Sequence, residues 1–385
     1  MFELELSQLE HQQLARHLIV VDSTDGPHIT VNGRSMLLMC SNDYLGLSYH
    51  SALRLAAQQS MENCGFGSGA SRLVSGTSAL HQELEKKIAR FKGTEAALLF
   101  NSGYAANTGI IPAIASTGDV VLSDCLNHAS IVDGCRLSKA EILVYRHKDL
   151  EHLETLMHTC IHARRKLIVT DGVFSMDGDI APLPGIVSLA EKYNAIVMVD
   201  DAHSTGVLGR TGKGSVEHFG LSGRVSIQMG TLGKALGSFG AYAAGSKDLI
   251  DFLINHARSF IYSTALPSSV CAASLAAIDV LEQEPERREK LWKNRSHFLT
   301  GLNAFGINTG DSETPIVPVH VGDSGQALKL AEKLFTYGIY VTAIRPPTVP
   351  VGSARIRTTV TAAHSWEDID LALDAFKRLR SEGYL

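Results

Sequence analysis

Between residues 93 and 245 the sequence repeats one pattern, in which a short apolar run is followed by a turn and then by a helical stretch. Apolar runs that alternate with amphipathic helices are typical of parallel strands joined by crossover helices. The pattern therefore predicts an α/β fold with a mostly parallel central sheet and helices on both of its faces. The runs are residues 96–100, 120–122, 141–145, 167–170, 195–199, 225–229 and 241–244.

Polar residues follow several of these runs. In sheets of this kind, ligands bind beyond the carboxyl ends of the strands, so these residues are the candidates for a site. The segment 101–107 opens a helix, where free backbone N–H groups and the positive end of the helix dipole favour a phosphate. Asp200 and His203 come after one run, and Lys234 comes after the next. We expect these strand ends to converge on one pocket.

Lys234 lies among glycines that let the backbone pass close to a bulky ligand. Most loop lysines are simply solvated, but a desolvated, partly cationic pocket makes the amine neutral and nucleophilic. Asp200 and Asp201 also have a purely structural alternative to a role in ligand binding, which is to cap a helix. Taken together, a lysine, a strand-end carboxylate and a helix N-terminus are what pyridoxal 5'-phosphate (PLP) requires for its aldehyde, ring nitrogen and phosphate. Since an isolated buried carboxylate is costly, we expect Asp200 to have a cationic partner.

Ordered motifs along nearly the whole chain resemble one family, the α-oxoamine synthases, which are fold-type I PLP-dependent transferases. These motifs are Asn42-Asp43-Tyr44-Leu45-Gly46, Asn127-His128-Ala129-Ser130, Asp200-x-x-His203, Thr231-x-x-Lys234 and Arg355-Ile356-Arg357. The resemblance implies a homodimer with a shared active site and a smaller C-terminal α/β domain. Within the family, residues 343–350 are similar to the corresponding segment of the 8-amino-7-oxononanoate synthases.

The resemblance also implies a role for each cofactor-binding residue. Lys234 matches the lysine that forms an imine with PLP, and Asp200 matches the carboxylate at the ring nitrogen. His128 matches a residue that stacks on the ring and polarises the incoming carbonyl. Ser175 and His203 match residues that bond the phenolic oxygen of the ring. The residues that match phosphate-binding positions are Gly103, Tyr104, Thr231 and, from a second subunit, Thr264.

Substrate-binding residues are implied in the same way. Asn42 and Arg357 match residues that hold the amino acid carboxylate, to which a planar guanidinium is suited. Thr348 matches a substrate contact, and Arg16 matches an arginine near the acyl group. The implied reaction joins L-alanine to a pimeloyl thioester, carried by coenzyme A or by acyl carrier protein, in biotin biosynthesis.

Other functions remain as alternatives to this one. The nearest is a 2-amino-3-ketobutyrate ligase, which uses glycine and acetyl-CoA, and a non-catalytic scaffold that binds a carrier protein is a second. A Rossmann site is disfavoured because no strand precedes the glycine-rich segment 65–76. A P-loop is excluded because Gly214, rather than Ser or Thr, follows Lys213.

Three segments are expected: an N-terminal arm over residues 1–45, a large PLP-binding domain over residues 46–285 and a small domain over residues 286–385. The hydrophobic pattern predicts one amphipathic helix over residues 1–20 and a long helix from Ser268 to about Leu302. From its position in a polar turn alone, Asn42 could cap a helix or contact a ligand, and helix capping is favoured.

Composition limits the function further. The net charge of −5 comes without a long block of either sign, so neither nucleic acid nor a membrane surface is an expected partner. No apolar run reaches the roughly 18 residues of a membrane span, and we expect a cytoplasmic protein. The 6 cysteines form no C-x-x-C pair, and His158 and His162 have no obvious third ligand, so no metal site is expected.

Overall fold

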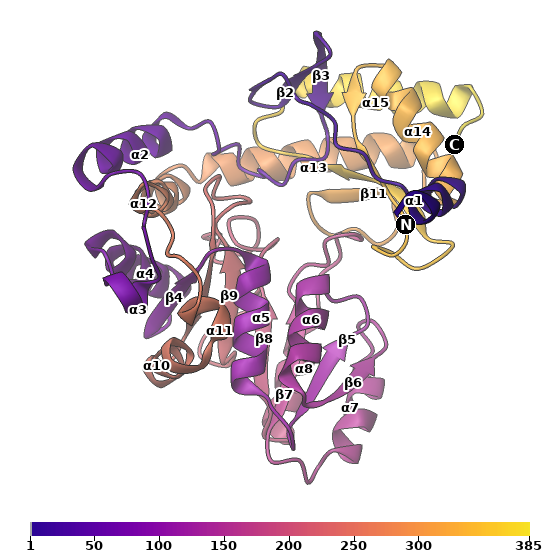
Figure 1. Ribbon diagram of the computed structural model, residues 1–385. Coiled ribbons are helices and arrows are strands. Elements are labelled where there is room, and N and C mark those ends of the chain that lie inside the picture. The colour runs from indigo at the N-terminus through magenta and orange to yellow at the C-terminus, as the bar shows by residue number, and fades with distance from the viewer. Residues whose placement is uncertain (1) are drawn as a thin grey trace. The chain divides into compact units, whose positions relative to one another are not determined.

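The computed structural model describes residues 2–385, which form two compact units (Figure 1). The central unit consists of Leu47–Phe174 and Ile180–Pro285. The terminal unit consists of the chain up to Gly46, the short segment Ser175–Asp179 and the C-terminal part Glu286–Leu385. The sequence predicted a separate arm over residues 1–45. In the structure these residues belong with the C-terminal segment, because β3 (Arg34–Leu38) lies parallel to β12 (Ile339–Tyr340).

A 7-stranded sheet, in the order β4-β10-β9-β8-β7-β5-β6, forms the core of the central unit. The strands from β9 to β6 are parallel to their neighbours, whereas β10 runs antiparallel to both β4 and β9. The predicted mostly parallel sheet is therefore confirmed. Its strands are β4 (Ala96–Phe100), β5 (Val120–Asp124), β6 (Glu141–Tyr145), β7 (Lys166–Asp171), β8 (Ile196–Asp200), β9 (Ile227–Thr231) and β10 (Ala241–Gly245).

Helices cover both faces of this sheet, as predicted. Alternate strand residues point to opposite faces, so Val121 and Val169 pack with one group of helices while Val120 and Ile168 pack with another. The first group is α5 (Gly103–Ile114), α6 (Ala129–Ser138), α10 (Lys247–His256) and α11 (Arg258–Ile261), and the second is α7 (Leu150–Thr159) and α8 (Leu183–Lys192).

The remaining helices of the central unit surround this core. α2 (Ser51–Cys64) and α4 (Ala79–Lys92) both pack against α12 (Ser268–Gln283). Ser78 caps α4, because its side chain accepts a hydrogen bond from the N–H of His81. Two short helices, α3 (Arg72–Ser75) and α9 (Ser215–His218), complete the unit.

Two smaller sheets form the terminal unit, in the orders β1-β2-β3-β12 and β11-β14-β13. The further strands are β1 (Ser23–Asp25), β2 (His28–Val31), β11 (Ile316–Gly322), β13 (Thr342–Ile344) and β14 (Ala354–Thr359). Its helices are α1 (Phe2–His11), α13 (Glu286–Ala304), α14 (Ser324–Thr336) and α15 (Trp366–Ser381). Phe298, Leu334 and Phe376 join the last three helices in one hydrophobic cluster, so this unit has a core of its own.

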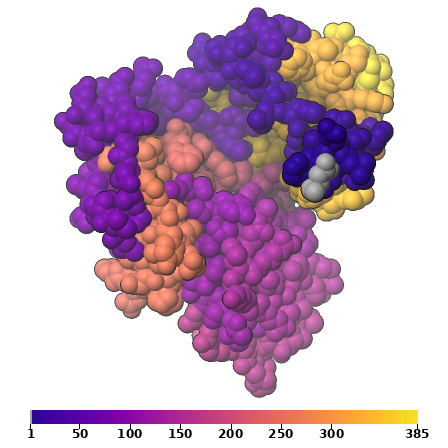
Figure 2. All heavy atoms as spheres, in the orientation of Figure 1, coloured from indigo at the N-terminus to yellow at the C-terminus, as the bar shows by residue number. Residues whose placement is uncertain are grey.

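Two helix predictions are wrong in extent. The helix expected over residues 1–20 ends at His11, because the backbone turns at Gln13 with φ 57°. No side chain of α1 is buried, and the helix lies at the surface (indigo in Figure 2). The long helix expected from Ser268 is two helices separated at Pro285, since proline disfavours a helical conformation in the residue before it. Within residues 2–385, no helix has both the length and the apolar character that crossing a membrane requires.

Candidate active site

Lys234 lies in the loop that connects β9 to the antiparallel strand β10. Hydrogen bonds of 2.9 Å from the N–H of Leu232 to the carbonyl of Gly240, and from the N–H of Ser238 to the carbonyl of Leu232, close this loop. The Lys234 side chain is half-buried, and its Nζ lies 2.9 Å from Nε2 of His203. The structure therefore brings together two residues that are far apart in the sequence and that were both predicted to bind the cofactor.

His203 is held by the turn that follows β8. The carbonyl of Asp201 accepts hydrogen bonds from the N–H groups of Ser204 and Thr205, at 3.0 and 2.9 Å, so the backbone curls around His203. His203 is 6% exposed, and Asp200 at the end of the strand is 3% exposed. Both side chains therefore belong to the interior of the central unit.

Asp200 is bonded to neutral groups. Its Oδ2 accepts a hydrogen bond from Asn107 Nδ2 at 2.8 Å, and its Oδ1 accepts one from the N–H of Ala202 at 2.9 Å. Burial raises the pKa of Asp200, although the nearby charge of Lys234 and the Asn107 bond oppose the rise. The hydrogen bonds that Asp200 accepts thus come from uncharged groups, and the cation near it is Lys234.

A chain of hydrogen bonds connects Asp200 to His128. Asn107 Nδ2 also donates to Ser130 Oγ at 2.9 Å, and Ser130 Oγ lies 2.7 Å from His128 Nδ1. His128 precedes α6 and accepts a hydrogen bond from the N–H of Ser130, so it caps this helix. The ring of His128, an exposed residue, is thus fixed at one side while the rest of it stays accessible.

Asp171 ends β7 directly beside Asp200 in the sheet register. Its Oδ2 accepts a hydrogen bond of 2.7 Å from the N–H of His128. Burial and then the neighbouring charge of Asp200 raise the pKa of Asp171 well above its ordinary value. The two strand ends thus carry a pair of buried carboxylates, of which Asp171 orients the backbone of His128.

The N-terminus of α5, where a phosphate cradle is predicted, lies beside Thr231 at the end of β9. A Cβ atom on Gly103 would lie 2.8 Å from Cγ2 of Thr231, so only glycine fits there without a shift. Tyr104 is 50% exposed, and its hydroxyl donates to Asp133. Its backbone N–H lies in the first turn of α5, where N–H groups have no partner within the helix. Free N–H groups at a helix start, next to a hydroxyl, suit a phosphate.

These residues fit PLP. The buried carboxylate of Asp200 accepts hydrogen bonds from neutral groups only, so it can pair with the protonated ring nitrogen of PLP, and Lys234 offers an amine near it. At the start of α5, Gly103 has no side chain to block the backbone N–H groups, which suits the phosphate. The chemistry of the donor set is therefore that of a PLP site.

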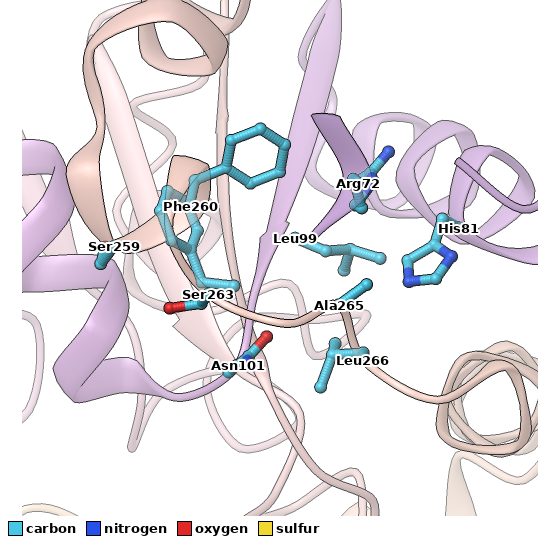
Figure 3. A pocket seen from close by; sticks show the side chains of 10 residues that line it. Arg72, His81, Leu99, Asn101, Ser259, Phe260, Ser263, Ala265 and Leu266 are labelled. Carbon is cyan, nitrogen blue, oxygen red and sulfur yellow. The ribbon is translucent and has the colours of Figure 1, made fainter. Parts of the chain in front are cut away.

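Thr264 is exposed, and its carbonyl accepts a hydrogen bond of 2.7 Å from Asn101 Nδ2. Asn101 also lines a small cavity that includes His81, whose Nε2 has no hydrogen-bond partner in the described part of the chain (Figure 3). The cavity measures about 10 Å³, which is room for about one water molecule. It is therefore too small to be a substrate site.

Arg357 and Asn42, predicted to hold a carboxylate, are in contact within the terminal unit. Arg357 Nη2 donates to Asn42 Oδ1 at 3.0 Å, and Arg357 Nε donates to the carbonyl of Ser175 at 2.6 Å. Asn42 lies in a turn and starts no helix, so the capping alternative is wrong. Neighbouring Arg355 forms an ion pair with Asp177, whereas Arg357 has no carboxylate partner among residues 2–385.

Thr348 and Arg16 lie in two segments of the terminal unit that Arg345 connects. Arg345 donates to the backbone carbonyls of Gln13 and Ala15, and its own carbonyl accepts a hydrogen bond from the N–H of Thr348. Burial and the charge of Arg16 lower the pKa of Arg345. Both Arg16 and Thr348 are exposed, so each is accessible to a ligand.

Asn107, Ser130 and Asp171 are the polar residues that sequence reasoning left without a role. Asn107 comes four residues, or about one helical turn, after Gly103, which places it on the same face of α5 as the cradle. That spacing is a usable signal. His158, considered above for a metal, lies instead 2.7 Å from the hydroxyl of Tyr193.

The chain matches the model of the family described as aminotransferase class I and II over residues 34–376. It is 52% identical to 8-amino-7-oxononanoate synthase of Geobacter sulfurreducens over 98% of this chain and 97% of that protein. It is 49% identical to 8-amino-7-oxononanoate synthase 1 of Bacillus subtilis, over 98% and 96% of the two chains. The chain belongs to the 8-amino-7-oxononanoate synthase family.

Solved structures are consistent with this family. A variant of serine palmitoyltransferase from S. paucimobilis with a bound PLP–myriocin aldimine has a TM-score of 0.95 and 33% identity, and the match covers 100% of this chain and 98% of that one. The 8-amino-7-oxononanoate synthase of Francisella tularensis has a TM-score of 0.78 and 30% identity, over 91% and 99% of the two chains. The predicted fold type and the predicted PLP dependence of this 8-amino-7-oxononanoate synthase family member are confirmed.

Proposed function

We propose that this protein condenses L-alanine with a pimeloyl thioester, releasing carbon dioxide and the carrier thiol, to form 8-amino-7-oxononanoate for biotin biosynthesis. The observation that carries the proposal is the identity of about half of all residues, over nearly the full length, with proteins of that name. The Lys234–His203 contact beside a buried Asp200 supports it, because those residue types are what the chemistry needs.

Bound PLP supplies an electron-withdrawing ring that stabilises negative charge at the α-carbon of the amino acid. Lys234 would hold the cofactor, and its amine would serve as the general base for the α-proton of alanine. Asp200 would keep the ring nitrogen protonated, and the hydrogen bonds from Asn107 and Ala202 hold its carboxylate in place. His203 and Ser175 would bond the phenolic oxygen of the ring.

The other cofactor contacts restrict movement of the ring and phosphate. Gly103 and Tyr104 offer backbone N–H groups, and the Thr231 hydroxyl adds a further donor. His128, which Ser130 and Asp171 orient, would hold the ring and polarise the carbonyl of the incoming thioester. The exposed Thr264 reaches the phosphate of a second subunit in a homodimer.

Arg357 and Asn42 bind the carboxylate of alanine. Arg357 is 6% exposed and carries a positive charge that its two bonds, to the carbonyl of Ser175 and to Asn42, do not neutralise. Its guanidinium is therefore prepared for an anion, whereas that of Arg355 is already paired with Asp177. A buried guanidinium binds a carboxylate through two parallel hydrogen bonds, which fixes the amino acid for reaction.

Thr348 and Arg16 contact the acyl substrate, whose carrier is either coenzyme A or acyl carrier protein. Both residues are exposed, and Arg345 fixes the backbone near each of them. We place the reaction in the cytoplasm, where both carriers are found.

Thiol release tests the function. The purified holoenzyme is given L-alanine with a pimeloyl thioester, or glycine with an acetyl thioester, and the liberated thiol is measured. We expect rapid release with the first pair, and faster release with the second pair would contradict the proposal. Lys234→Ala is expected to lose both turnover and the visible absorbance of bound PLP. Lys247→Ala is the control, since Lys247 is exposed and pairs with Asp251.

A further inference from the structure

Lys92 and Asp201 form a buried ion pair next to the cofactor-binding residues of the central unit. Lys92 is the last residue of α4, and Asp201 directly follows β8. Nζ of Lys92 lies 2.9 Å from Oδ2 of Asp201, and the two side chains are 0% and 1% exposed. Desolvation largely offsets the attraction within such a pair, so stability alone is a weak reason for its presence.

The pair connects three segments that are distant in the sequence. Asp201 Oδ1 accepts hydrogen bonds from both the N–H and the hydroxyl of Ser215, and Lys92 also donates to the carbonyl of Lys213. Glycines leave room for these contacts. A Cβ atom on Gly172 would lie 2.6 Å from Asp201 Oδ1, and one on Gly214 would lie 2.8 Å from Asp201 Cγ.

Asp201 is also the first residue of the turn that carries His203. Its N–H donates to the carbonyl of Met229 at 2.7 Å, and its carbonyl accepts the two bonds that form the turn. Consecutive residues at a strand end point to opposite sides, so Asp200 turns toward Asn107 while Asp201 turns toward Lys92. A displacement of Asp201 would therefore move both Asp200 and His203.

We propose that Lys92 is a positioning residue for the cofactor site, because its ammonium fixes Asp201 and thereby the turn that sets His203 against Lys234. The inference rests on the cofactor roles proposed above for these two residues. Burial favours a neutral amine, but the interactions with Asp201 and Tyr242 together outweigh burial and raise the pKa of Lys92, so its ammonium is retained at neutral pH. The tight packing around Asp201 leaves the turn little freedom while the pair is intact.

Lys92→Met removes the ammonium and keeps most of the side-chain volume. Apo-protein is titrated with PLP, and the visible absorbance of the loaded protein is followed against pH. We expect PLP to bind at least about tenfold more weakly, the effect of losing roughly one hydrogen bond to a charged group. The pH midpoint of the absorbance change is also expected to differ from that of the wild type, because His203 is the residue proposed to bond the ring oxygen.

Loss of stability alone would not produce both the weaker PLP binding and the shifted pH midpoint. Ile88→Ala is the matched control, since Ile88 lies on the same helix, is 1% exposed, and leaves a cavity when truncated. Melting temperatures of the apo-proteins show how much stability each variant loses. We expect Ile88→Ala to lower the melting temperature while keeping the wild-type affinity for PLP and pH midpoint.

Asp201→Asn supplies a milder variant in case Lys92→Met does not fold. It keeps the shape of the side chain and weakens the contact with Lys92, so the same changes are expected at smaller size. If either folded variant binds PLP as the wild type does and keeps its pH midpoint, or if Ile88→Ala matches Lys92→Met in both, the inference is wrong. Because PLP binding is measured without either substrate, a failure of the condensation assay would not be mistaken for this result.

Discussion

Replacing Asn107 by leucine tests whether the amide between Asp200 and Ser130 maintains the cofactor site. Asn107 is 0% exposed, and its Nδ2 donates to Asp200 Oδ2 at 2.8 Å and to Ser130 Oγ at 2.9 Å. Its Oδ1 has no partner among the described residues, so the substitution leaves no donor unsatisfied there. Leucine has a similar volume, which keeps the packing of α5 against the sheet nearly unchanged.

The expected magnitude follows from these two bonds. A hydrogen bond to a charged group contributes about 1.5–3 kcal/mol and a neutral one about 0.5–1.5 kcal/mol. The first bond favours the ionised form of Asp200, which is the form that pairs with the ring nitrogen of PLP. Its loss should weaken PLP binding by about tenfold to a hundredfold, at about 1.4 kcal/mol for each factor of ten.

Titration of the apo-protein with PLP measures this effect. Ile110→Ala is the control, because it leaves a cavity on the same buried face of α5 and keeps both bonds of Asn107 in place. We expect the control to bind PLP within a few-fold of the wild type. An affinity of Asn107→Leu within about threefold of the wild type would refute the reasoning, because it would correspond to less than about 0.7 kcal/mol.

Three further predictions address the substrate, the phosphate and pH. Arg357→Lys keeps the charge but loses the planar fork, so KM for alanine should rise by about tenfold or more while affinity for PLP stays unchanged, as steady-state kinetics and titration will show. Gly103→Ala should weaken binding of PLP and of inorganic phosphate in competition assays, because its Cβ would meet Thr231. The raised pKa of Asp171 means that folded apo-protein binds this proton more tightly than the unfolded chain, so stability is highest below the ordinary aspartate pKa and falls as pH rises through the raised one. Asp171→Asn should therefore raise the melting temperature of the apo-protein at neutral pH and have little effect in acid, and an equal effect at both would contradict this assignment.

The central sheet, and the convergence of the segments that carry Lys234 and His203 at one edge of it, could be predicted from the sequence. Both depend on local patterns, because apolar runs define the strands and the strand ends of a parallel sheet meet at one edge. The break at Pro285 was equally local, and the proline was the signal that the prediction of one long helix overlooked.

The partner of Asp200 could not be predicted in the same way. A buried carboxylate implies a compensating cation, but the sequence does not indicate which neutral groups orient that carboxylate. In the structure Asn107 on α5 donates to Asp200, and this contact depends on the position of α5 relative to the end of β8. Likewise, the bond from Arg357 to Asn42 joins residues more than 300 positions apart, so no local pattern indicates it.

The reversed direction of β10 has a consequence for the loop that carries Lys234. Because β10 runs antiparallel to β9, the chain returns at once, and residues 232–240 form a hairpin connection rather than a crossover. Pairing of Thr231 with Ala241 anchors both ends of this connection at adjacent positions of the same sheet. The reach of the lysine is thus set by the register of two strands. An insertion of even one residue between Thr231 and Ala241 would change that reach, whereas the same insertion in a surface crossover would be absorbed.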